Sequence, residues 1–108
     1  MIIVGLDIST SITAYSVMDT ELPLGQRLLK SDSIHLSKIK DSYVKSCKVR
    51  EELLSLNKTF KIDRVVVEES LQSFRMGLSS AKTLSVLTRF NGVVSFLAQD
   101  IFKVSCER

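Results

Sequence analysis

The chain has 108 residues, of which 44% are hydrophobic and 25% charged, and its formal net charge is +3. One Pro and four Gly exclude collagen-like and Pro/Gly-rich disordered chains. No apolar run reaches the roughly 18 residues of a membrane helix, and the N-terminus lacks the basic segment of a signal peptide. We therefore expect one globular domain, residues 1–108, that is cytoplasmic and has no membrane partner. The mild positive charge permits a polyanionic partner without requiring one.

The first third of the chain predicts three strands. Residues 2–8 (IIVGLDI) form a nearly continuous run typical of a strand covered on both faces. After a short polar turn, residues 12–18 alternate in character and predict the second strand of an antiparallel hairpin. Residues 19–25 hold the only Pro and predict a turn. Residues 26–35 are more polar and predict a third strand near a sheet edge.

A helical period begins at Leu36 and predicts an amphipathic helix over residues 36–58. Residues 64–68 (RVVVE) then predict a short strand, parallel to an earlier one because a helix-length crossover precedes it. The predicted apolar stripe of the helix is Leu36, Ile39, Tyr43, Cys47 and Leu54, with Val44 and Leu53 at its flank.

The last third predicts a loop over residues 71–78 and a second helix from Ser79 or Ser80 to about Gln99. This helix is apolar around most of its circumference, so we expect it to be largely buried. Residues 101–106 predict a last strand. The order β-β-β-α-β-α-β indicates an α/β fold with a mixed sheet, in which strands 1–3 are antiparallel and strands 4 and 5 run parallel to strand 1.

The candidate chemistry lies at the carboxyl ends of two apolar strands, where Asp7 and Glu68 stand. A carboxylate beside buried apolar surface is costly unless it is paired or binds a cation. If the two strands are parallel neighbours, both carboxylates lie at the sheet edge where α/β sheets bind ligands. They would then form an oxygen site suited to Mg²⁺ or Mn²⁺. Alternatively, Asp7 caps the turn that follows it and Glu68 is solvated; periodicity does not choose between Glu68 and Glu69.

Other metal chemistry has little support in the sequence. Cys47 and Cys106 are far apart and His35 is the only histidine, which nearly excludes a zinc site. Without an export signal, the two cysteines are expected to remain thiols in a reducing compartment.

Two stretches carry a family resemblance. Residues 3–17 resemble the opening hairpin of RuvC-like Holliday-junction resolvases, with Gly-hydrophobe-Asp, a small polar turn, and an aromatic-small-Val ending. Residues 63–69 are similar to the family's second acidic motif, in which the first Glu after an apolar triplet binds metal. Residues 79–84 and 91–94 resemble the helix that follows. Together with the element order, the motifs are more specific for the RNase H-like superfamily than for its RuvC branch.

The resemblance implies an RNase H-like fold and a Mg²⁺- or Mn²⁺-dependent endonuclease that resolves branched DNA in recombination and repair. Asp7 and Glu68 would be the metal ligands and catalytic residues. A homodimer is implied because a four-way junction presents two symmetric strands. The Ser-Thr-Ser turn resembles phage-type variants, which implies a bacterial or phage-infected cell.

The sequence departs from the family pattern in two places. Ile8 and Ser9 stand where many members have Pro and Gly. The family also carries acidic residues on a C-terminal helix after the fifth strand, whereas this sequence stops at Arg108. The domain is therefore expected to lack that helix, either because the sequence is C-terminally truncated or because the chain lacks the full catalytic set. Glu107 is at the wrong place to substitute for those residues.

Several residues are candidates for contacting DNA near the acidic pair. Lys82 and Arg89 lie seven apart on one predicted helix face and could contact phosphates, or could be ordinary solvated charges. Phe74 could wedge against a base, or could anchor its loop to the core. The full predicted set for nucleic acid is Ser9, Thr10, Ser11, Phe74, Arg75, Lys82 and Arg89.

Two other functions remain open at this stage. An RNase H-like module could bind DNA or a partner without cutting. An ATP-binding lobe of the actin, Hsp70 and sugar-kinase superfamily also places Asp and small residues after its first strand. Such loops carry Gly near phosphate, where this chain has Ser9 and Ser11.

Overall fold

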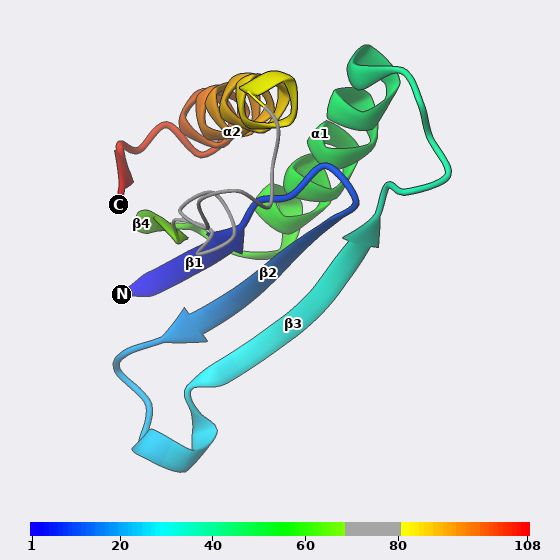
Figure 1. The fold of residues 1–108 in the computed structure, drawn as a ribbon. Coiled ribbons are helices and arrows are strands. Elements are labelled where there is room, and N and C mark those ends of the chain that lie inside the picture. The colour runs from blue at the N-terminus through cyan, green and yellow to red at the C-terminus, as the bar shows by residue number, and fades with distance from the viewer. Residues whose placement is uncertain (69–80) are drawn as a thin grey trace.

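The computed structural model describes residues 1–68 and 81–108 (Figure 1). The predicted loop at 71–78, with Phe74 and Arg75, lies outside the described residues, as do Glu69 and the predicted start of the second helix. The strands are β1 (Ile2–Asp7), β2 (Ile12–Asp19), β3 (Leu28–His35), β4 (Arg64–Glu68) and β5 (Cys106–Glu107). The helices are α1 (Ser42–Thr59), α2 (Ala81–Phe102) and a short 3-10 helix, η1 (Leu24–Gln26).

The five strands form one sheet in the order β3-β2-β1-β4-β5. β1, β2 and β3 are antiparallel neighbours, while β4 runs parallel to β1 and β5 parallel to β4. The crossover through α1 makes the β1–β4 pairing parallel, because the chain must return to the starting edge before β4 begins. The predicted mixed α/β sheet is confirmed.

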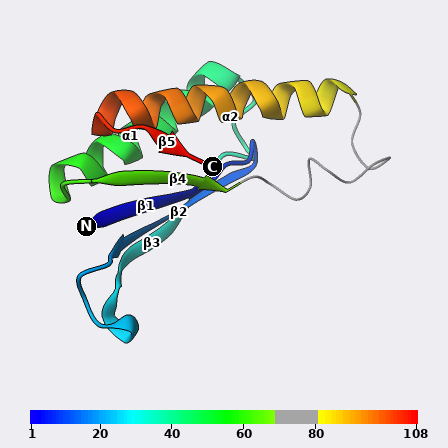
Figure 2. The ribbon, with the colours of Figure 1, turned by 90° about the vertical axis from the view of Figure 1, so that its left-hand side faces the viewer.

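Both helices lie on the same face of the sheet, as Figure 2 shows. Alternate strand residues point to this face and are fully buried, among them Val4, Val17 and Val65. The helices add to this core Val49, Leu53 and Leu56 of α1 and Phe90, Val94, Ala98 and Phe102 of α2. In the part of the chain that the structure describes, no helix covers the opposite face, so the expectation that β1 is covered on both faces is wrong there.

The boundary and the buried face of the first helix differ from the prediction. α1 begins at Ser42 because the Asp41 carboxylate accepts hydrogen bonds from the backbone N–H groups of Tyr43 and Val44. Leu36 is fully buried but lies before the helix, so counting the apolar stripe from Leu36 gave the wrong helical phase. Tyr43 is in fact 76% exposed, and the buried residues lie on another side of the helix.

The second helix is longer than predicted and less buried. α2 continues through Phe102 and is followed by Lys103, whose φ of 58° is left-handed and stops the helix. The predicted strand over 101–106 is therefore wrong at its start, and β5 holds only Cys106 and Glu107. Val93 and Phe96 are 43% and 64% exposed, which overturns the expectation of a largely buried helix.

Two smaller expectations can also be compared with the structure. Cys47 and Cys106 are both free thiols. Within residues 1–68 and 81–108, neither α1 nor α2 has the length and apolar character that a bilayer span requires.

Candidate functional site

Asp7 and Glu68 lie side by side at one edge of the sheet. Asp7 is the last residue of β1, Glu68 is the last residue of β4, and the two are direct partners in the parallel register. Because residues paired in register point to the same face of a sheet, both side chains project from the face without helices. Both are exposed and both line a cavity of about 510 Å³. The structure thus brings the predicted pair together, while their role as ligands stays a prediction.

Neither carboxylate has a structural partner within residues 1–68 and 81–108. Among the described residues, Asp7 and Glu68 take part in no hydrogen bond and no ion pair. The alternative role of Asp7 as a cap for the following turn is not what the structure shows, because the turn amides donate to hydroxyl groups. The Ser11 N–H donates to the Ser9 hydroxyl, and the Ser9 N–H donates to the hydroxyl of Thr13.

The donor set fits a hard divalent cation. Two like charges directly opposite each other on neighbouring strands repel, and a bound cation removes that repulsion. Mg²⁺ is commonly held by one or two carboxylates and keeps its remaining positions for water and substrate phosphate. Within residues 1–68 and 81–108, no group of three or more His, Cys, Asp and Glu side chains is placed to share a metal ion. Among these residues the predicted site therefore consists of two carboxylates.

Glu107 is engaged elsewhere. Its two carboxylate oxygens accept from the Nε and Nη2 of Arg64, both at 2.6 Å, and this bidentate pair ties β5 to β4. The Arg64 hydrogen bond lowers the pKa of Glu107 below its ordinary value. Glu107 is the register partner of Val66 in the middle of β4, and its carboxylate is bound to Arg64 at the start of that strand, whereas Glu68 stands at the end.

Neither positively charged candidate on α2 lines the cavity that Asp7 and Glu68 line. Lys82 is exposed in the first turn of the helix. Arg89 donates to the Ser85 hydroxyl at 3.1 Å and lines a different cavity, the groove between the two helices. Their contacts with nucleic acid stay predictions.

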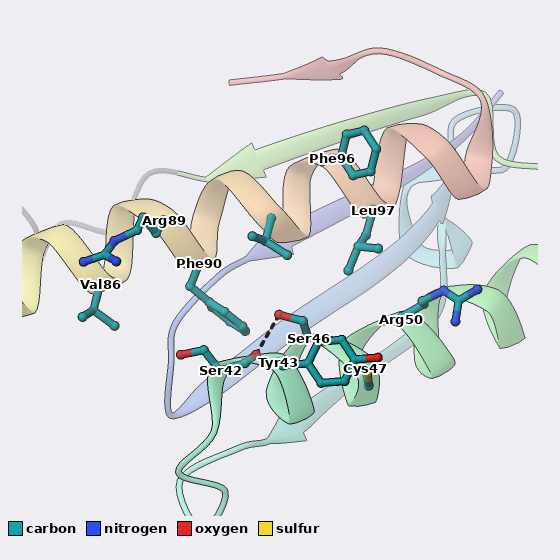
Figure 3. Close-up of a pocket in the computed structure, with 11 residues that line it drawn as sticks. Ser42, Tyr43, Ser46, Cys47, Arg50, Val86, Arg89, Phe90, Phe96 and Leu97 are labelled. Atoms are coloured by element: carbon teal, nitrogen blue, oxygen red, sulfur yellow. Dashed lines mark hydrogen bonds between the residues drawn. The ribbon is translucent and has the colours of Figure 1, made fainter.

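The groove between α1 and α2 was missed by the sequence reasoning. It has a volume of about 660 Å³, and Figure 3 shows Phe90 and Leu97 of α2 pointing toward α1, whereas Phe96 points away. The sequence feature that points to it is the distribution of apolar residues around most of the circumference of α2, which the sequence analysis interprets as burial of the helix. The groove is lined by Ser42, Tyr43, Ser46, Cys47, Arg50, Val86, Arg89, Phe90, Val93, Phe96 and Leu97.

The sheet order, the mixed strand directions and the acidic ends of β1 and β4 define an RNase H-like fold. A structure of Thermus thermophilus RuvC in complex with a Holliday junction substrate superposes with a TM-score of 0.74 and 15% identity. That comparison covers 98% of this chain and 62% of the RuvC chain. A second T. thermophilus RuvC structure gives a TM-score of 0.63 and 20% identity, covering 91% and 59%.

The chain therefore has a RuvC-like resolvase fold and spans about 60% of the length of either RuvC chain. No protein-family model matches the sequence. No curated protein matches it either.

Proposed function

We propose that this protein is a divalent-metal-dependent endonuclease that cuts branched DNA of the Holliday-junction type. The observation that carries the proposal is the placement of Asp7 and Glu68. They are register partners at the ends of adjacent parallel strands, with no partner among the described residues, in a fold shared with a RuvC structure that holds a junction.

Asp7 and Glu68 would hold Mg²⁺, or Mn²⁺ in its place. The ion supplies Lewis-acid chemistry for phosphodiester hydrolysis when bound. Both carboxylates are exposed on a face without helices in the described residues, which gives a DNA backbone access to them. The hydroxyl groups of Ser9 and Ser11 stand just beyond Asp7 and can donate to a phosphate oxygen.

The direct test is nicking of a synthetic four-way junction in Mg²⁺. Asp7→Asn keeps the shape of the side chain but removes the charge, so it should bind the junction and fail to cut it. The matched control is Asp32→Asn, an exposed carboxylate on β3 that should leave cutting unchanged. Cleavage at the wild-type rate by Asp7→Asn would show that the proposal is wrong. Junction binding without cleavage by the wild-type chain, in Mg²⁺ and in Mn²⁺, would select the non-cutting module instead.

We also propose that the protein forms a homodimer through the outward face of α2. Arg89, Val93, Phe96 and Asp100 recur at spacings of four, three and four residues, which places them along one helix face. The middle two are exposed apolar side chains and the outer two carry opposite charges. Two antiparallel copies of such a stripe are self-complementary, with Val93 against the partner's Phe96 and Arg89 against the partner's Asp100.

Charge reversal tests this arrangement without reference to cleavage. Arg89→Glu and Asp100→Arg should each weaken self-association about tenfold in sedimentation experiments, since each puts like charges opposite one another. The double variant restores opposite charges and should regain the association. Lys103→Gln serves as the control, because Lys103 contacts Asp100 within the same chain at 3.4 Å. A monomeric wild-type chain, or a double variant weaker than both single variants, contradicts the proposed interface.

A further inference from the structure

The turn that follows Asp7 is fastened to the scaffold at each of its carbonyl oxygens. The hydroxyl of Thr13, which is fully buried, donates to the Ser9 carbonyl at 3.0 Å. The backbone N–H of Leu36, just beyond β3, donates to the Ser11 carbonyl at 2.8 Å. Because both donors belong to the packed part of the molecule, the two ends of the turn cannot move independently of the sheet.

The middle carbonyl of the turn, that of Thr10, is held by a side chain from far along the sequence. Lys45 lies in the first turns of α1, and its ammonium donates to this carbonyl at 2.6 Å, across 35 residues. Figure 1 shows the β1–β2 connection lying beside α1. A hydrogen bond from a charged donor is shorter and stronger than one between neutral groups, and this one is partly buried.

These contacts leave the polar side chains of the turn as its outward-facing groups. The hydroxyl groups of Ser9 and Ser11 are 3.0 Å apart, and this contact is exposed. Ile8, fully buried, is the only residue between Asp7 and the turn. The direction of the Asp7 carboxylate is thus set by strand pairing on one side and by the clamped turn on the other.

We propose that Lys45 is a positioning residue for the acidic edge: by holding the Thr10 carbonyl it fixes the 9–11 turn and the orientation of Asp7. The expected effect of Lys45 on cleavage rests on the proposed nuclease function, whereas the contact between Lys45 and Thr10 does not depend on it. Lys45 then acts through the backbone and makes no contact with DNA. Without its ammonium, the Thr10 carbonyl bonds to water and the turn gains freedom next to the carboxylate that must meet the metal ion.

Lys48 provides a matched control on the same helix. Its ammonium donates to the carbonyl of His35 at 2.8 Å, which is the same kind of bond made to the end of β3 instead of to the turn. Lys45→Met and Lys48→Met therefore remove the same charge and the same type of hydrogen bond. They differ in whether the turn next to Asp7 is released.

The experiment has three readouts on the 108-residue chain. Amide hydrogen exchange of residues 9–11, measured by NMR without DNA or metal, should accelerate about tenfold in Lys45→Met and stay unchanged in Lys48→Met. The single-turnover rate of junction cleavage in Mg²⁺ should fall about tenfold in Lys45→Met only. Junction affinity should keep the wild-type dependence on salt concentration, because a positioning residue releases no counterions from DNA.

Each contrary result is distinct. Wild-type exchange at residues 9–11 in Lys45→Met overturns the proposal, because the clamp would then be absent in solution. A slope of log affinity against log salt that is smaller by about 0.9 also overturns it, since that is the signature of one lost phosphate contact. Accelerated exchange together with a wild-type chain that never cuts would establish the clamp and overturn the proposed nuclease function instead.

Discussion

The acidic edge of the sheet and the groove between the helices are cavities of similar volume, about 510 and 660 Å³, and both have mostly apolar linings. The edge ends in two exposed carboxylates that face no structural partner in the described residues. The groove is lined mostly by apolar side chains from α1 and α2. The two carboxylates that we propose as metal ligands therefore lie at the smaller of these two cavities.

The acidic edge and the groove differ in how much their residues contribute to the stability of the fold. Asp7 and Glu68 make no hydrogen bond or ion pair with the described residues, and like charges on paired strands oppose folding. The groove residues instead lie against the core, as Phe90 does at 4% exposure, or stand on the outward face of α2, as Phe96 does. Substitutions at the edge should therefore change chemistry and not stability, whereas those on α2 should change packing and association.

The largest expected effect is the loss of cleavage in Glu68→Gln. Removing a carboxylate that we propose as a metal ligand should forfeit several kcal/mol of transition-state stabilisation, or about 1000-fold in the single-turnover rate. The midpoint of urea unfolding should stay the same or rise, because one of two repelling charges is gone. If Glu68→Gln cuts normally but unfolds more easily, Glu68 has a structural role and not the catalytic role that we propose.

A smaller effect is expected on the outward face of α2. Phe96→Ala should weaken self-association by about 2 kcal/mol, or about 30-fold, as truncating an aromatic anchor does at protein interfaces. Leu54→Ala, an exposed apolar residue of α1 that does not line the groove, is the control and should associate normally. Equal effects in the two variants, followed by sedimentation, would mean that α2 is not the interface.

The smallest effect concerns a carboxylate that does have a partner. Arg64 lowers the pKa of Glu107 below its ordinary value of 4.5, so the folded state is stabilised by this charge at neutral pH. That stabilisation is lost as the pH falls through the lowered pKa. Glu107→Gln should therefore unfold at slightly lower urea than wild type at pH 7, and this difference should disappear in acid, below the lowered pKa, with cleavage unchanged. A difference that persists in acid would show that it does not come from the ion pair.

The strands and the acidic pair could be predicted from the sequence because they depend on short local patterns. Apolar runs that end in Asp7 and Glu68 predicted two strand ends, and a helix-length crossover predicted their parallel pairing. Periodicity also predicted α1, but its phase came from Leu36, which packs in the core from outside the helix. The helical repeat of apolar residues can be recognised in a sequence. Which face of the helix is buried depends on what the helix packs against.

Taken alone, the chain of residues determined the order of elements, the mixed sheet and the two carboxylates, because side-chain alternation and helical period are properties of neighbouring residues. Tertiary structure alone decided that Asp7 faces Glu68 in register, that Val93 and Phe96 stay exposed, and that Lys45 reaches Thr10. These contacts join residues up to 61 positions apart or depend on which helix face finds the sheet. Such contacts depend on the packing of the whole core, so they cannot be predicted from a local sequence pattern.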